Sequence, residues 1–391
     1  MRSILLTILV LSSSAILAQT TWVADNNFNA PTGPNVFSSI QACINAASPG
    51  DIIQVQPSPT TYGNAVIEIE NITLMGIGFN VDKEIPLISR MGTITLKNNI
   101  DNTSDADGTK IKGLLFTTIT LGLESGGNYL LENILIQNCQ FISFNIGSGS
   151  SFSPVDGLEI RGCYLTSTSS SAHQVYQSLD NGIIRNNVIL GTLYFVAPTS
   201  GNTIVSNNII YGRIYLVAVA GNMTVLNNNF IGATGTDYAF QSKMENCIVN
   251  NNIFYGNTPS IAVGGTSSGE FEFNSFNNNL VYSTGDDTMP PTGGLGNNGT
   301  GNINVSPDFL NVPLLGTYSS SYDFTLNGGS PAINAGSNGT DIGISGGTSY
   351  IWPDANLVLK TSAVPVIQIL NTSTVINPGD DLPVRVKANS N

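Results

Sequence analysis

The chain has 391 residues, only 10% of them charged, and a formal net charge of −13. This acidity argues against nucleic acid or an anionic membrane surface as the main partner. The length would suit two ordinary domains, but a repeat that grows along one axis can use most of it as a single domain.

The N-terminus has the pattern of a secretory signal peptide. Arg2 precedes an apolar run at residues 4–11, three serines and residues 15–18 follow, and cleavage is expected near Ala18. The run is too short to span a bilayer, and no later stretch is apolar enough to do so. We therefore expect a secreted or cell-surface protein without a transmembrane segment.

Residues 35–47 predict a short amphipathic helix, which Pro49 and Gly50 stop before a strand at 52–55. Its apolar residues fall at helical spacing: Phe37, Ile40, Ile44 and Ala47. Such a helix would cover the open first coil of a solenoid. Further strands are expected at residues 65–69, 93–96, 111–116 and 130–136.

Between residues 130 and 282, one six-residue phrase recurs seven times at intervals of 20 to 27 residues. The copies start at Ile136, Ile160, Ile184, Val205, Val225, Val249 and Phe276 and read IQNCQF, IRGCYL, IRNNVI, VSNNII, VLNNNF, VNNNIF and FNNNLV. The first and sixth columns are apolar in every copy and are predicted to point into a core.

The third column of the repeat is asparagine except for Gly162, which predicts a left-handed bend between two strands. The fourth column begins with Cys139 and Cys163 and continues as asparagine, whose amides would hydrogen-bond along a stack. The two cysteines lie one coil apart, so a disulfide and stacked free thiols are both open.

This pattern of short strands and tight bends resembles the right-handed parallel β-helix of the pectin lyase-like superfamily. Residues 39–62 and 72–78 resemble the entry segment of secreted β-helix proteins. Residues 306–311, 322–336 and 341–343 resemble the closing coil of secreted bacterial ones. The resemblance implies an all-β solenoid with an N-terminal capping helix, an Asn ladder and a short C-terminal β segment.

We predict three parts: a signal peptide at 1–18, a β-helix domain at 19–348, and a β-hairpin or small β module at 349–391. The last rests on alternating apolar and polar residues at 364–370 and 382–387. The Gly/Pro/Asn-rich stretch 284–302 is expected to be an exposed, mobile loop.

The second column of the repeat places Arg161 and Arg185 on successive coils. Residues 167–180, between them, contain the only histidine, His173, and also Tyr176. Arginines that neutralise a uronate, with a histidine or tyrosine that removes its α-proton, would provide polysaccharide lyase chemistry.

A purely structural interpretation of the same residues is equally simple. Arg161 and Arg185 would pair with Glu159 and Asp180 at the surface, and His173 would be a solvated loop residue. The paired aspartates and Gly-His-Gly of polygalacturonases and the motifs of calcium-dependent pectate lyases are absent, so the catalytic residues, if any, stay unknown.

A calcium site is suggested by the alternating acidic residues Asp101, Asp105 and Asp107, which precede Gly108. A simple Asp/Gly turn before the strand at Ile111 explains the same pattern. No other cofactor is expected.

The seventh column would form an outward strip if strand alternation continues. Its members are Ile142, Thr166, Leu190, Tyr211, Ile231, Tyr255 and Tyr282. Sugar rings pack on aromatic faces, so Tyr211, Tyr255 and Tyr282 are candidate glycan-binding residues. The alternative is that loops cover the strip or that it turns inward.

Two functional classes remain. We favour a secreted or cell-surface β-helix that binds a polysaccharide or cell-surface glycan or serves as an adhesive or structural element. The alternative is a polysaccharide lyase or glycoside hydrolase acting on an acidic polysaccharide. The oligomeric state does not follow from the sequence.

Overall fold

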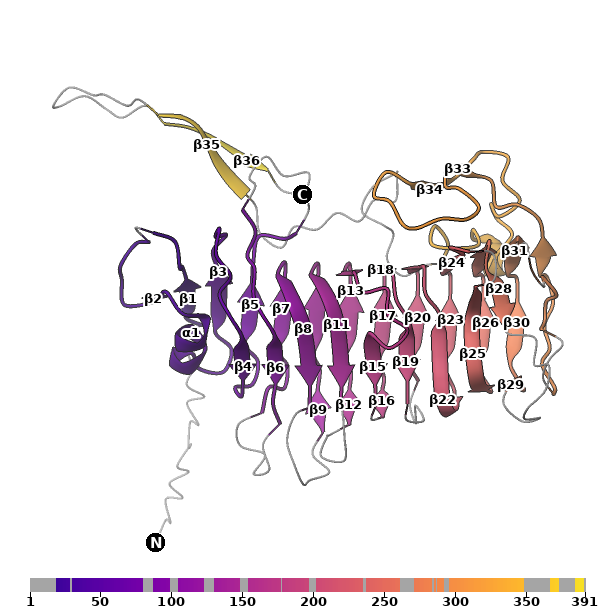
Figure 1. Ribbon diagram of the computed structural model, residues 1–391, viewed down its shortest axis with the longest axis horizontal. Coiled ribbons are helices and arrows are strands. Elements are labelled where there is room, and N and C mark those ends of the chain that lie inside the picture. The colour runs from indigo at the N-terminus through magenta and orange to yellow at the C-terminus, as the bar shows by residue number, and fades with distance from the viewer. Residues whose placement is uncertain are drawn as a thin grey trace, which may run out of the picture.

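The computed structural model is a right-handed parallel β-helix whose coils stack along one axis (Figure 1). The predicted signal peptide lies outside the described residues. The structure describes residues 19–28, 30–79, 87–98, 105–122, 130–147, 154–176, 178–196, 202–234, 237–260, 271–282, 285, 287–291, 295–347, 366–372 and 384–389.

One long parallel sheet, sheet 1, runs the length of the solenoid. In spatial order its strands are β2 (Val36–Phe37), β1 (Thr21–Ala24), β3 (Ile52–Val55), β5 (Thr73–Met75), β7 (Lys110–Lys112), β10 (Leu135–Gln137), β13 (Glu159–Arg161), β17 (Ile183–Arg185), β20 (Ile204–Ser206), β23 (Thr224–Leu226), β26 (Ile248–Asn250) and β30 (Ser275–Asn277).

After each bend the chain enters sheet 2 and then sheet 3, which the long strands β8 (Leu115–Leu121) and β11 (Gln140–Ile146) join. Sheet 2 continues as β14 (Tyr164–Leu165), β18 (Val188–Ile189), β21 (Ile209–Ile210), β24 (Asn229–Ile231), β27 (Ile253–Tyr255), β31 (Leu280–Tyr282) and β32 (Ile303–Asn304). Sheet 3 contains β4 (Ala65–Ile67), β6 (Ile94–Leu96), β15 (His173–Val175), β19 (Leu193–Phe195), β22 (Ile214–Gly221), β25 (Tyr238–Glu245), β28 (Thr258–Ser260) and β29 (Phe271–Glu272).

The column assignments of the repeat are confirmed. Every residue of the first and sixth columns is buried, and the third column has φ between 53° and 61° in all seven copies. Identical side chains from successive coils stack in the core, as Phe116 on Phe141 and Phe230 on Phe254 do at 4.9 and 5.2 Å between ring centroids. Such pairs add about 0.5–1.5 kcal/mol each to the burial term.

The fourth column forms the predicted Asn ladder. Each side-chain Nδ2 donates to Oδ1 of the asparagine on the next coil, at 2.9–3.1 Å, from Asn187 through Asn208, Asn228, Asn252 and Asn279 to Asn302. The same side chains bond backbone groups inside the bend, so the buried polar groups of these turns are satisfied.

A second column of left-handed bends precedes the strands of sheet 1, and the sequence analysis did not predict it. Its left-handed residues are Asn133, Gly157, Asn181, Asn222, Asn246 and Phe273. Phe273, with φ of 57°, is the exception, because a phenylalanine has no side-chain group that eases this conformation. Its ring is half-exposed and lies over Gly296.

Replacing Phe273 by asparagine should therefore raise the free energy of unfolding by about 1 kcal/mol. Denaturant unfolding of the wild type and the variant measures the difference. Phe273→Ala is the control, because it removes the ring but keeps the cost of left-handed backbone. Stabilisation by alanine as large as that by asparagine would show that the ring, rather than the backbone, is the source of strain.

Two strand boundaries differ from those predicted. The single strand expected at 111–116 is two strands, β7 and β8, with Gly113 bent between them at φ of 62°. The strand expected at 130–136 is likewise divided at Asn133 into β10 and the short β9 (Leu131–Glu132). β9 pairs with β12 (Val155–Asp156), which pairs with β16 (Leu179–Asp180). In both cases one left-handed residue turns a corner of the coil.

The capping helix α1 (Ile40–Ala46) is shorter than predicted, because Phe37 belongs to β2 and Ser39 is the N-cap. The Gln41 side chain donates to the carbonyl oxygen of Val66 at 3.0 Å and accepts from its N–H at 2.8 Å. One amide side chain thus completes the backbone hydrogen bonds at the edge strand β4, which is how the helix covers the open end.

The closing segment, residues 306–347, does not form a further coil. It contains the antiparallel pair β33 (Phe309–Asn311) and β34 (Asp323–Leu326) and the 3₁₀ turn η1 (Ser337–Gly339), and it folds back over sheet 2 (Figure 1). Phe309 and Phe324 pack with Ile231 and Ile253 of the outer face. Much of the apolar outer surface of sheet 2 is thereby removed from water.

The outward side chains of the third-column asparagines hold this segment in place. Asn207 Nδ2 donates to the carbonyl oxygens of Ile344 and Gly346 at 3.1 and 2.9 Å, and Asn251 Oδ1 accepts from the N–H of Ser337 at 2.9 Å. The bend asparagines therefore both turn the coil and dock the closing segment.

The ends of the described chain match the expectations in part. A short C-terminal β segment is confirmed, since β35 (Val366–Thr372) and β36 (Val384–Asn389) pair antiparallel. The expected mobile loop at 284–302 contains ordered structure, because Asn297 and Asn302 each extend a buried ladder of side-chain amides.

Candidate functional site

The structure separates the residues predicted as a catalytic set. Arg161 and Arg185 lie on the outer face of sheet 1, where both contact Glu159. Arg185 Nη2 is 2.6 Å and Arg161 Nη1 is 3.3 Å from Glu159 Oε1. The purely structural interpretation of the sequence predicted this pairing of the arginines with Glu159.

His173 is not a solvated loop residue. It lies on β15 with no exposed surface, stacked on Phe144 at 5.3 Å between ring centroids. Burial lowers its pKa to about 3, and neither ring nitrogen has a hydrogen-bond partner among the described residues. Strand alternation directs this side chain into the coil, so it reaches neither the arginines nor solvent.

The acidic residues of the candidate calcium site have other structural roles. Asp101 lies outside the described residues. Asp105 is buried, and Asp107 Oδ1 accepts a hydrogen bond from the Glu132 N–H at 2.7 Å. Burial raises the pKa of Asp107, and the nearby Asp105, Glu132 and Glu70 add to the effect. The described residues include no group of three or more metal-binding side chains.

The predicted tyrosine strip is covered for most of its length. Tyr255 is buried under the closing segment and donates to the Val312 carbonyl oxygen at 3.1 Å, and Tyr211 packs edge-on against Tyr318. Tyr282 keeps 38% of its surface exposed. For Tyr211 and Tyr255, the alternative prediction that loops cover the strip therefore applies.

The two stacked cysteines are free thiols. Cys139 Sγ donates to the Gln137 carbonyl oxygen at 3.2 Å, and Cys163 Sγ to that of Arg161 at 3.3 Å. Burial raises the pKa of Cys163 well above its ordinary value. Each thiol thus occupies the place that asparagine takes on later coils.

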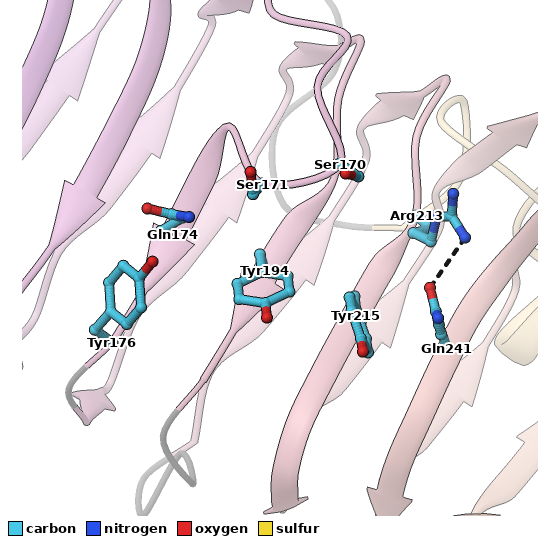
Figure 2. Close-up of a pocket in the computed structure, with 8 residues that line it drawn as sticks. All are labelled: Ser170, Ser171, Gln174, Tyr176, Tyr194, Arg213, Tyr215 and Gln241. Atoms are coloured by element: carbon cyan, nitrogen blue, oxygen red, sulfur yellow. Dashed lines mark hydrogen bonds between the residues drawn. The ribbon is translucent and has the colours of Figure 1, made fainter. Parts of the chain in front are cut away.

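A different row of tyrosines is partly exposed, on the outer face of sheet 3. Gln174, Tyr194, Tyr215 and Gln241 are register neighbours on β15, β19, β22 and β25, and Tyr176 follows directly after β15. Figure 2 shows the three tyrosine rings side by side across successive strands. We call this surface the tyrosine face.

A hollow of about 420 Å³ lies over the tyrosine face. The Tyr194 and Tyr215 rings meet edge to face at 4.9 Å between centroids, and the loop residues Ser170 and Ser171 border the hollow on one side (Figure 2). Burial raises the pKa of Tyr194, with the neighbouring Tyr215 and Tyr176 adding to it, so its hydroxyl is neutral at physiological pH.

Among the described residues that line this hollow, Arg213 is the cationic one. Its Nη1 donates to Gln241 Oε1 at 2.9 Å, and its guanidinium carbon lies 4.5 Å from the centre of the Tyr238 ring. No carboxylate of the described residues forms an ion pair with it. The two contacts orient a positive charge without neutralising it.

Of this site, the sequence analysis identified only Tyr176. A signal for the rest exists: LYF at 193–195 and IYL at 214–216 each place a tyrosine between two inward apolar residues. These triplets follow glycines after the repeat phrase, and loops of variable length separate them from the next coil. For that reason they do not align as a column.

Among the described residues, no helix is long and apolar enough to cross a membrane. Neither a scan against protein-family models nor a search of curated protein sequences finds a match to this chain.

Several solved structures are similar to this chain at low sequence identity. DFA-IIIase from Arthrobacter chlorophenolicus A6 in complex with DFA-III has 14% sequence identity and a TM-score of 0.41 over 76% of this chain and 86% of that one. The PL6 family alginate lyase AlyGC has 14% identity and a TM-score of 0.36 over 79% of this chain and 57% of its own. A PL6 alginate lyase in complex with a trisaccharide has 12% identity and a TM-score of 0.31 over 73% and 85%. We therefore take the function from the site alone.

Proposed function

We propose that the tyrosine face binds a chain of an anionic polysaccharide outside the cytoplasm. Tyr194 and Tyr215 would stack on the apolar faces of sugar rings, and Arg213 would bind a carboxylate or sulfate. The strands of sheet 3 repeat every 4.8 Å or so, which is comparable with one sugar unit, so a chain lying across them meets similar contacts at each step.

The observation that carries this proposal is the unneutralised charge of Arg213 beside the partly exposed rings. The protein has a net charge of −13 and would repel a polyanion at most of its surface. A cation held by Gln241 and Tyr238 at the edge of an aromatic surface provides a local site of the opposite sign. A neutral glycan alone would not need it.

A second candidate function is polysaccharide lyase activity at the same hollow. The specific observation in its favour is that Arg213 and three tyrosine hydroxyls line one surface, which are the group types that β-elimination from a uronate requires. The raised pKa of Tyr194 keeps its hydroxyl protonated at neutral pH, so little phenolate is present to remove a proton, which favours binding over catalysis.

Hydrolysis is less consistent with the lining residues. It requires two carboxyl groups held at a defined separation. None of the described residues that line this hollow is acidic. Asp237 lines a second hollow, which shares Ser170 and Arg213 with the first, and its Oδ2 accepts hydrogen bonds from the N–H groups of Ala233 and Thr234, both at 2.7 Å. The Asp237 carboxylate therefore stabilises the turn of its own loop.

Replacing Arg213 by glutamine should weaken binding of polygalacturonate or alginate about 10- to 100-fold, because one charge-assisted contact is lost. Affinity electrophoresis or calorimetry measures the binding, and formation of unsaturated uronate ends reports lyase activity. Methyl-esterified polygalacturonate, which lacks the charge, should bind the wild type more weakly and be indifferent to the substitution.

The matched control is Arg90→Gln, which removes the same charge from an exposed residue on an earlier coil. Equal losses in the two variants would mean that only overall charge matters. If acidic and esterified chains bind the wild type equally, the anionic ligand is wrong. If no glycan binds, an adhesive or structural role without glycan recognition is left.

A further inference from the structure

A second hollow, of about 430 Å³, adjoins the one over the tyrosine face and shares Ser170 and Arg213 with it. We propose that this side pocket binds a single neutral sugar unit attached as a branch to the acidic chain. The inference rests on the proposed function, because the branch is placed by the main chain lying on the tyrosine face.

The walls of the side pocket suit an uncharged sugar ring. Tyr211 and Tyr318 meet edge to face at 5.6 Å between ring centroids, and Tyr238 lines the pocket from β25. Leu190 and Ala233 add apolar surface. Aromatic and aliphatic walls with a few hydroxyl groups are the usual composition of a site for a small polar molecule with apolar faces.

The polar groups of the pocket favour a neutral ligand. Asp237 is engaged by the N–H groups of its own loop, and Arg213 stands at the boundary with the other hollow. The Tyr211 hydroxyl is buried and has no hydrogen-bond partner among the described residues, so one donor of a residue that lines the pocket is unused. Burial raises the pKa of this phenol, which keeps it protonated.

The position of the pocket favours a branch over the main chain. It lies at the corner between sheets 2 and 3, beside the row of tyrosines, and the closing segment supplies one wall through Thr317 and Tyr318. Gly191 and Gly212 form the corner, where a Cβ on Gly212 would lie only 1.9 Å from the Gly191 carbonyl oxygen. Close stacking of these glycines leaves the corner bare of side chains.

Binding of two defined oligomers tests the pocket: an oligogalacturonate of about six units, and the same oligomer with one xylose branch. The wild type should bind the branched oligomer about tenfold more tightly, as one additional ring becomes buried. Thr317→Trp, which fills the pocket, should abolish this preference and leave binding of the linear oligomer unchanged. Ala233→Trp fills it from another lining residue and should have the same effect if the first variant does not fold.

Leu315→Trp is the matched control, because it adds the same ring to the closing segment at an exposed residue that does not line the pocket. It should keep the preference. Equal binding of both oligomers by the wild type, or a preference that survives filling, would overturn the side pocket but not the proposed function. Failure to bind either oligomer would overturn the side pocket, and it would overturn the proposed function as well if alginate also fails to bind.

Discussion

Replacing Asn228 by alanine should lower the free energy of unfolding by about 3–5 kcal/mol, since it interrupts the ladder in the middle. Its Oδ1 accepts from the N–H of Asn208 at 3.0 Å, and its Nδ2 donates to the Val205 carbonyl oxygen at 2.8 Å and to Asn252 Oδ1 at 3.0 Å. Alanine would leave several of these buried groups without partners, and each costs about 1–3 kcal/mol.

Chemical denaturation of both proteins, followed by circular dichroism, measures this loss. Asn202→Ala is the control, because Asn202 is exposed and lies just before β20 of sheet 1, outside the ladder. We expect a change near zero there. A loss at Asn228 no larger than that at Asn202 would mean that the amide stack does not stabilise the solenoid.

Acidification should destabilise the protein through His173. In the unfolded chain this histidine has the ordinary pKa of about 6.5, whereas burial lowers the pKa in the folded state to about 3. Above pH 6.5 the side chain is neutral in both states and has no effect. As the pH falls below 6.5, the unfolded state binds a proton that the folded state does not, so the free energy of unfolding falls until about pH 3.

Between pH 6.5 and 4.5 this linkage amounts to about 2 kcal/mol. His173→Leu should remove it, because leucine matches Leu193, the inward neighbour on the next coil. Unfolding of both proteins across this pH range measures the difference, in which the contributions of the carboxylates cancel. If the wild type and the variant lose stability in parallel, His173 is not buried in its neutral form.

The candidate site illustrates how far residue types alone can mislead. Arg161, Arg185 and His173 are close in sequence and chemically suited to a lyase, yet alternation along the strands directs the arginines outward from sheet 1 and the histidine into the core. The sequence pattern does not single out Arg213 or Tyr194, because their spatial neighbours come from successive coils whose loops differ in length.

The closing segment explains why most of the predicted tyrosine strip is covered. Strand alternation correctly placed Tyr211 and Tyr255 on the outside of sheet 2, but the chain returns from residues 306–347 to cover them. Tyr318 of that segment then becomes a wall of the side pocket. Most of the strip that was predicted to bind glycans is therefore a packing surface. The tyrosine face, which we propose as the binding surface instead, lies on sheet 3, the next sheet along each coil.

The repeat pattern alone predicts the coil: which columns point inward, where Asn and Gly bend the chain, and that the fourth column stacks. These properties are local, since they depend on strand alternation, on the left-handed preference of Asn and Gly, and on a repeat that each coil satisfies with its neighbour. Which outer faces remain open could not be predicted in this way, because it depends on a segment that docks on asparagines such as Asn207 from 137 residues away.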